Sequence, residues 1–98
     1  MEKSTPHCKL QIIRALIEEG KVHITLSAYS GASKLGLYRE DILRVVNTLA
    51  TKNFYKSMTS NNNHKIWQDV YRTKFKHIDI YLKLTVSDQV LIVSFKEL

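Results

Sequence analysis

Apolar residues in the N-terminal half recur at every third or fourth position, which is the spacing of one helix face. The stretches with this spacing predict helices over residues 6–19, 27–35 and 39–50. Thr5 and Pro6 form a typical helix start for the first of them, and Gly20 and Gly36 end the first and the second. Residues 22–24 are suited to a short strand between these two helices.

The C-terminal half changes to a two-residue period. Between Ile78 and Val86, apolar and polar residues alternate without a break, which predicts a strand with one core face and one polar face. Three further runs bounded by turn residues extend this pattern, so strands are predicted over residues 54–59, 66–72, 78–86 and 90–96. Because the helices all precede these strands, we expect an α+β fold in which N-terminal helices pack on one face of a mainly antiparallel C-terminal β-sheet.

The length and composition exclude several classes of protein. A chain of 98 residues is expected to form a single domain over residues 1–98 with one modest core. No apolar run is long enough to cross a bilayer and no apolar segment follows the N-terminal charges, so a cytoplasmic protein is expected. The single cysteine, Cys8, can form neither an internal disulfide nor a closed zinc site, and the four histidines lack metal-ligand spacing. We therefore expect no metal site and no cofactor in this chain.

Positive charge exceeds negative charge along the chain. Fifteen Lys and Arg residues oppose nine Asp and Glu residues, which gives a net charge of +6. Residues 51–68 contain Lys52, Lys56 and Lys65 but no carboxylate. This distribution favours a polyanionic partner such as nucleic acid, although an ordinary solvated surface is an equal alternative on charge alone.

The lengths of the turns decide which polar side chains meet on the sheet, because paired residues in an antiparallel ladder have a constant index sum. We assume a two-residue turn at residues 88–89, a three-residue tip at 61–63 and a four-residue loop at 73–76, among several allowed choices. These turns align one row across the four strands, made of Lys56, Gln68, Tyr81 and Lys96. The row is about 14 Å wide, which suits a phosphodiester with its flanking nucleotides. On geometry alone, such residues are more often ordinary surface residues than catalysts.

The same alternation sorts the remaining side chains of the strands between the two faces. Phe54 and Met58 share the face of Lys56, where they could pack against bases. The aromatic residues expected on the core side are Tyr55, Trp67, Tyr71 and Phe95. Arg72 and Lys83 are candidate phosphate contacts, so Met58, Arg72 and Lys83 form the set of candidate nucleic-acid-binding residues.

Several stretches are long and unusual enough to identify a family. They are FYKSMT over residues 54–59, IWQDVYR over residues 66–72, YLK with TV over residues 81–86, VLIVSFKE over residues 90–97, and the N-terminal MEK with TPH. Together they closely resemble the MqsR toxin family. The resemblance is close in the second half and at the extreme N-terminus, and it lies mainly in pattern over residues 8–52.

This resemblance implies a RelE-like form of the α+β fold and a metal-independent mRNA endoribonuclease, the toxin of a bacterial type II toxin–antitoxin pair. It implies cleavage at GC-containing sites, typically GCU, with arrest of translation and growth until an antitoxin neutralises the toxin. The implied partners are mRNA and MqsA, an antitoxin with a zinc-binding N-terminal domain and a helix-turn-helix C-terminal domain. The family residues implicated in activity correspond to the four residues of the predicted row, Lys56, Gln68, Tyr81 and Lys96.

RNA cleavage without a metal requires a base, an acid and positive charge at the phosphate. We assign the positive charge to Lys96, hydrogen-bond donation to Tyr81, base or oxyanion contact to Lys56, and orientation of the phosphate or ribose to Gln68. A lysine base would need a pKa lowered by the neighbouring lysine. The competing interpretations are a nucleic-acid-binding module without catalysis and a domain that only docks a protein partner.

Overall fold

Six strands form one sheet in the order β1-β3-β4-β5-β6-β2 in the computed structural model, which describes residues 1–98. The strands are β1 Glu2–Lys3, β2 Val22–Ile24, β3 Phe54–Thr59, β4 Trp67–Phe75, β5 Ile78–Val86 and β6 Val90–Glu97. All neighbours are antiparallel except β2, which runs parallel to β6. The four predicted C-terminal strands are confirmed, and so is the short strand predicted over residues 22–24, which is β2 at one edge of the sheet. The short strand β1 at the other edge was not predicted.

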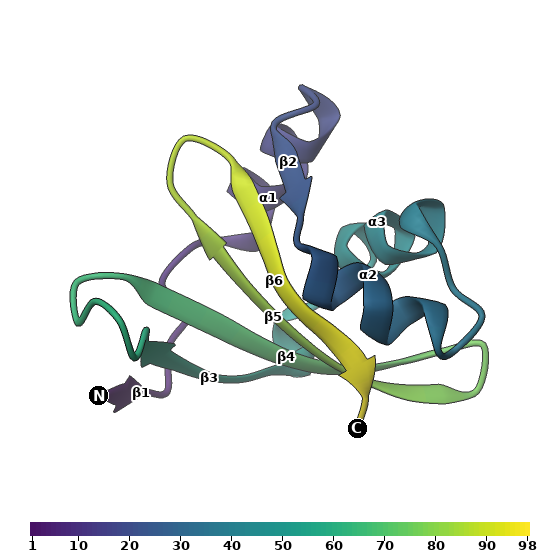
Figure 1. The fold of residues 1–98 in the computed structure, drawn as a ribbon. Coiled ribbons are helices and arrows are strands. Elements are labelled where there is room, and N and C mark those ends of the chain that lie inside the picture. The colour runs from purple at the N-terminus through teal and green to yellow at the C-terminus, as the bar shows by residue number, and fades with distance from the viewer.

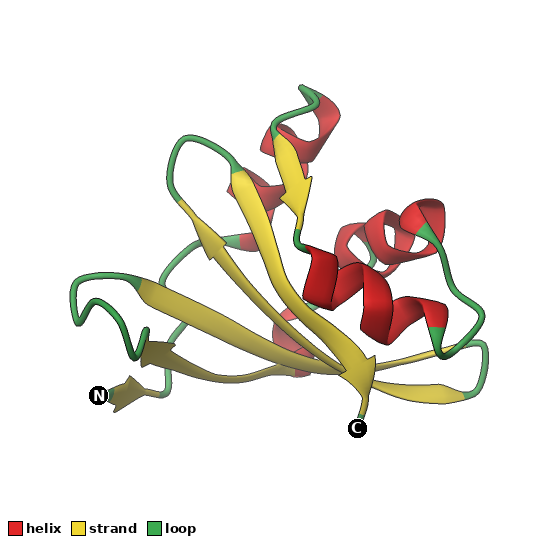
Figure 2. Cartoon of the chain, in the orientation of Figure 1, coloured by secondary structure: helices red, strands yellow, loops and turns green.

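Three helices cover one face and one edge of this sheet (Figures 1 and 2). They are α1 Leu10–Glu18, α2 Leu26–Ser33 and α3 Arg39–Asn47, and a 3₁₀ turn, η1 Thr51–Asn53, leads into β3. No helix covers the opposite face, which we call the open face. The α+β class and the one-sided packing of the helices are therefore confirmed. None of the helices is long and apolar enough to cross a membrane.

The alternation in β5 determines which face is buried. Ile80, Leu82 and Leu84 have no exposed surface and pack with the helices in the hydrophobic core, so the odd-numbered residues between them point to the open face. Helix α2 runs so close to β6 that a Cβ atom built on Gly31 would overlap the carbonyl oxygen of Phe95. Glycine at this position therefore permits the close packing of α2 against the sheet.

The first helix begins four residues later than predicted. The backbone N–H groups of His7 and Cys8 donate to the carboxylate of Asp69 in β4, at N–O distances of 3.0 to 3.1 Å. These bonds hold the segment extended against the sheet, so α1 begins at Leu10 and the helix start predicted at Thr5 is wrong. The cause is a contact over about sixty residues of sequence, which a local pattern does not reveal.

Replacing Asp69 with alanine is expected to destabilise the protein strongly. The carboxylate is 2% exposed, and its loss leaves two backbone N–H groups without their acceptor. Hydrogen bonds to a charged group contribute about 1.5–3 kcal/mol, so the melting temperature should fall by about 10 °C or more. Thermal denaturation followed by circular dichroism measures this change.

The matched control is Asp79→Ala, which removes an exposed carboxylate paired with Lys74 at 3.0 Å. Exposed ion pairs contribute little, so this variant should melt within a few degrees of the wild type. An equal fall for both variants would show that Asp69 is no more important to the fold than a surface carboxylate.

Candidate active site

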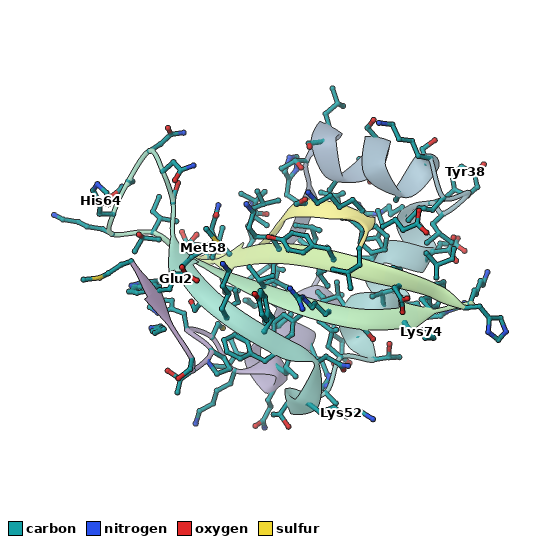
Figure 3. The ribbon with its side chains drawn as sticks, turned by 90° about the horizontal axis from the view of Figure 1, so that it is seen from below. Glu2, Tyr38, Lys52, Met58, His64 and Lys74 are labelled. Carbon is teal, nitrogen blue, oxygen red and sulfur yellow. The ribbon has the colours of Figure 1, made fainter.

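The open face carries a row of polar side chains across β4, β5 and β6. Tyr81 pairs with Lys96, as predicted, and on its other side with Arg72. The ammonium nitrogen of Lys96 lies 5.0 Å from the centroid of the Tyr81 ring, a cation–π contact. Figure 3 looks onto this face, where the strands lie in front of the helices. We call Arg72, Tyr81 and Lys96 the central row.

Gln68 does not belong to this row, which corrects the prediction. Residues in β3 and β4 pair symmetrically about Asn63, with Lys56 opposite Val70 and Met58 opposite Gln68. The predicted tip at 61–63 placed the centre one residue earlier, and therefore moved each pairing by two positions.

The connection between β4 and β5 moves Gln68 further away. It is a two-residue turn at Lys76 and His77, both with positive φ, and the predicted loop at 73–76 is wrong. Positive φ at two non-glycine residues is uncommon, so the residue types of this segment do not indicate so tight a turn. Gln68 is separated from Arg72 by four residues along β4, about 13 Å.

A β-bulge in β3 reverses the predicted places of two aromatic residues. The register shifts between Phe54 and Lys56, so Tyr55 is 45% exposed instead of facing the core. Phe54 packs edge-on against the buried Tyr71, with ring centroids 5.6 Å apart, instead of sharing the face of Lys56. The guanidinium carbon of Arg72 lies 3.6 Å from the Tyr55 ring centroid, so the bulge extends the central row by one aromatic side chain.

The other predicted orientations are partly confirmed. Tyr71 and Phe95 are buried as expected, whereas Trp67 is only half-buried. Met58 and Lys83 lie on the open face, Met58 between Glu2 and Gln68 and Lys83 beside Ser94.

Lys56 also lies outside the predicted row, because it pairs with Val70, and Val70 pairs with Lys83, two residues along β5 from Tyr81. Lys56 is paired with a carboxylate that the sequence did not indicate. Its ammonium nitrogen is 2.9 Å from Glu2, which β1 places opposite Met58 (Figure 3). The hydrogen bond and charge of Glu2 raise the pKa of Lys56, with smaller contributions from Tyr55 and Tyr81, and Lys56 in turn lowers the pKa of Glu2. A raised pKa favours the charged form of Lys56, which is the opposite of the lowered pKa that Lys56 would need as a base. A two-residue strand has too few positions to show a period, so the pattern does not predict β1 or the contact of Glu2 with Lys56.

Replacing Glu2 with glutamine is expected to lower the pKa of Lys56, because the charge that raises it is removed. The ion pair is intact above the ordinary pKa of glutamate and is lost as the pH falls through the lowered pKa of Glu2. Titration of the lysine ¹³Cε resonances by NMR measures the change. Asp79→Asn, which removes a carboxylate bound to Lys74, should leave Lys56 unchanged. A Lys56 pKa that is the same with and without Glu2 would contradict the pairing.

A cavity of about 410 Å³ adjoins the end of the central row, between α2 and β6. Lys96 lies on its wall together with Lys34 and three serine residues, Ser27, Ser30 and Ser94. Hydroxyl donors and two ammonium groups are suited to phosphate and ribose oxygens.

The arrangement concentrates positive charge and hydrogen-bond donors on one surface. Arg72 and Lys96 pair with Tyr81 on either side, Lys56 is close enough for Tyr81 to influence its pKa, and no histidine lies in β3, β4, β5 or β6. No group of three or more His, Cys, Asp or Glu side chains is placed to hold a metal ion. This surface can bind a phosphodiester, neutralise its charge and donate a hydrogen bond to it.

Comparisons with known proteins identify relatives of the whole chain. Residues 5–97 match the family described as "Motility quorum-sensing regulator, toxin of MqsA". The mRNA interferase toxin MqsR of Escherichia coli (strain K12) is 47% identical over 97 residues, which cover 99% of each chain. The similarity thus includes all the strands that form the open face.

Proposed function

The chain belongs to the MqsR toxin family, and from this membership we propose that it is an mRNA interferase, an endoribonuclease that acts as the toxin of a bacterial type II toxin–antitoxin system. Its relative in Escherichia coli is named for this activity. The observation that carries the proposal is the central row, in which Tyr81 lies between Arg72 and Lys96 on a face free of helices.

In the proposed reaction, hydroxide or water from the solvent takes the proton of the RNA 2′-hydroxyl, and the 2′-oxygen attacks the adjacent phosphorus. The bond from phosphorus to the 5′-oxygen breaks and that oxygen takes up a proton from the solvent, which leaves a 2′,3′-cyclic phosphate and a 5′-hydroxyl. Negative charge increases on the phosphate oxygens in the transition state, so cations and donors already in place lower the barrier. Lys96 and Arg72 supply this charge, and Tyr81 donates a hydrogen bond to the reacting phosphate.

Lys56 acts as a cation in this scheme, since its ion pair with Glu2 keeps it protonated. In this role it contacts a phosphate oxygen next to Tyr81, and it no longer serves as a candidate base. Glu2 is the carboxylate of the open face that is closest to Lys56, and it positions that side chain toward the substrate.

Gln68 orients the RNA at a distance from the reacting phosphate, because the register separates it from the central row by about 13 Å. Met58, between Glu2 and Gln68, offers a flexible apolar contact for a base. Lys83 binds a phosphate along the same path and holds the RNA without reading its sequence.

Further properties follow from family membership. We propose cleavage at GC-containing sites, typically GCU, in the cytoplasm, and without a metal ion, because three cations are available for the phosphate charge. The family description names MqsA as the partner of the toxin. An MqsA-like antitoxin, with its zinc-binding and helix-turn-helix domains, is therefore the proposed protein partner.

One assay separates this function from a nucleic-acid-binding module without catalysis. The purified protein is incubated with a GCU-containing RNA in EDTA, and the products are separated on denaturing and native gels. Discrete fragments support the nuclease, whereas a shifted band without fragments favours the binding module. A protein that neither shifts nor cleaves RNA would instead fit a domain that only docks a protein partner.

A further inference from the structure

The sheet opens at one end, away from the central row. Strands β4 and β5 are paired only from Phe75–Ile78 to Asp69–Leu84, and beyond this point the two hairpins diverge (Figure 1). A cavity of about 320 Å³ lies in the opening, with Lys65 and Trp67 on one side and Thr85 and Leu91 on the other. His7 completes the wall. We call this the end cavity.

The walls of the end cavity combine aromatic surface with positive charge. Trp67 is half-buried, and the His7 ring stacks on it with centroids 5.9 Å apart and planes inclined by 22°. The Lys3 ammonium group lies 4.2 Å from the centroid of the Trp67 ring, and Lys65 lies at the mouth. Nucleobases stack on aromatic side chains, and lysines neutralise the adjoining phosphates.

Hydrogen bonds within the protein fix the walls of the end cavity. The backbone N–H of His7 is fixed by the buried carboxylate of Asp69, and the Thr85 hydroxyl donates to the Trp67 carbonyl oxygen at 2.7 Å. That bond spans the gap where the backbone ladder between β4 and β5 has ended. The aromatic wall is thus held in place before a ligand arrives, which reduces the entropic cost of binding.

Its position relates the end cavity to the reaction. Thr85 follows Tyr81 by four residues along β5, a separation of about 13 Å, which is the length of a short run of nucleotides. Gln68, the neighbour of Trp67 in β4, lies on the open face, whereas the Trp67 ring, with His7 and Lys3, lies on the opposite face. A strand of RNA that crosses the row along β4 and β5 would pass Gln68 and then enter the gap between the two hairpins at the end of the sheet to reach the end cavity.

We propose that the end cavity is a nucleobase subsite, which takes one base of the RNA a few nucleotides from the bond that is cleaved. The nature of the ligand rests on the proposed function, whereas the aromatic and cationic walls are independent of it. The subsite also gives Gln68 a role at a distance from the chemistry, since it would guide the chain from the row to the cavity.

Trp67 is the only tryptophan of the chain, so its fluorescence reports on the end cavity directly. The probe is a GCU-containing RNA of ten nucleotides with one 2′-deoxy residue at the cleaved position, which prevents attack but keeps every base. Binding is expected to quench the fluorescence. A series of the same oligonucleotide with one abasic position each should contain a single position, outside the cleaved step, that removes the quenching and weakens binding about tenfold or more.

Protein variants provide the second arm. Lys65→Ala should weaken binding of the intact oligonucleotide, and the matched variant Lys52→Ala, at an exposed lysine in η1, should not. With the oligonucleotide that lacks the base bound in the end cavity, the affinities of wild type and Lys65→Ala should differ less than with the intact oligonucleotide. The reason is that neither protein then has a stacked base next to position 65.

The outcomes distinguish the subsite from the proposed function. Cleavage of the all-ribose RNA with no quenching by any oligonucleotide, or equal quenching by every abasic form, would overturn the subsite and leave the nuclease intact. Quenching that depends on one base without any cleavage would support the subsite and contradict the nuclease. Quenching by an antitoxin protein but not by RNA would assign the end cavity to a protein partner and overturn the proposal.

Discussion

Replacing Tyr81 with phenylalanine is expected to lower the single-turnover rate of RNA cleavage by about 10²-fold or more, with little loss of RNA affinity. The hydroxyl is the only group removed, and the ring keeps its contact with the Lys96 ammonium group at 5.0 Å. A donor that acts mainly on the transition state changes turnover more than ground-state binding. The substitution should not unfold the sheet, because Tyr81 lies on the open face and outside the core.

Single-turnover cleavage of a short GCU oligonucleotide measures this effect, with a thermal melt to exclude unfolding. Tyr38→Phe is the matched control, since this tyrosine is 69% exposed at the start of α3. The control should cleave at the wild-type rate. If Tyr81→Phe also stays within about threefold of wild type, the loss is less than the ~1 kcal/mol of one hydrogen bond, and Tyr81 has a binding or structural role.

Replacing Lys56 with alanine should abolish growth arrest when the protein is expressed. The pairing with Glu2 keeps Lys56 charged, and the loss of one positioned cation or donor at a reacting group typically costs about 10² to 10³ in rate. Lys56 lies outside the hydrophobic core, so truncation of its side chain should contribute little to unfolding.

Growth of an inducible strain and the yield of soluble protein are measured together. Lys52→Ala removes an exposed lysine four residues earlier in the chain and should remain as toxic as the wild type. Full toxicity of Lys56→Ala at equal soluble yield would remove Lys56 from the active site.

Local patterns predicted the strands well because burial imposes a period. The alternation from Ile78 to Val86 predicted β5 with the same bounds as in the structure, and the pairing of Tyr81 with Lys96 was correct. The two-residue turn assumed at 88–89 was nevertheless wrong, because Val86 pairs with Val90 across a three-residue turn. A bulge where the register shifts between Lys83 and Leu84 restores the assumed pairing for the rest of the hairpin, so the correct result needed a feature that the turn length alone does not predict. The resemblance to a known family supplied the activity, which no periodic pattern contains.

The rest of the register depended on turns that the sequence describes poorly. Lys76 and His77 adopt left-handed conformations that are uncommon for residues other than glycine, and this tight turn placed Arg72 beside Tyr81. The bulge that exposes Tyr55 contains no glycine, so the sequence carries no signal for it. Lys56 and Gln68 were therefore placed in the wrong row, although their face was predicted correctly.

Contacts between distant parts of the chain were beyond local reasoning. Asp69 lies in a strand and looks like any other polar residue there, yet its carboxylate fixes the segment before α1. Glu2 reaches Lys56 because β1 adds to the edge of the sheet, a pairing of two residues only. Both cases require knowledge of which strands are neighbours.

The central claim, that the open face cleaves RNA by attack of the 2′-hydroxyl without a metal, is tested most directly by the ends of the products. A GCU-containing oligonucleotide and its copy with one 2′-deoxy residue at the cleaved position are incubated with the protein in EDTA, and the fragments are identified by mass spectrometry. The account predicts a fragment ending in a 2′,3′-cyclic phosphate from the all-ribose RNA and no cleavage of the 2′-deoxy position. Cleavage at the 2′-deoxy position, or no cleavage until a divalent metal is added, would contradict it.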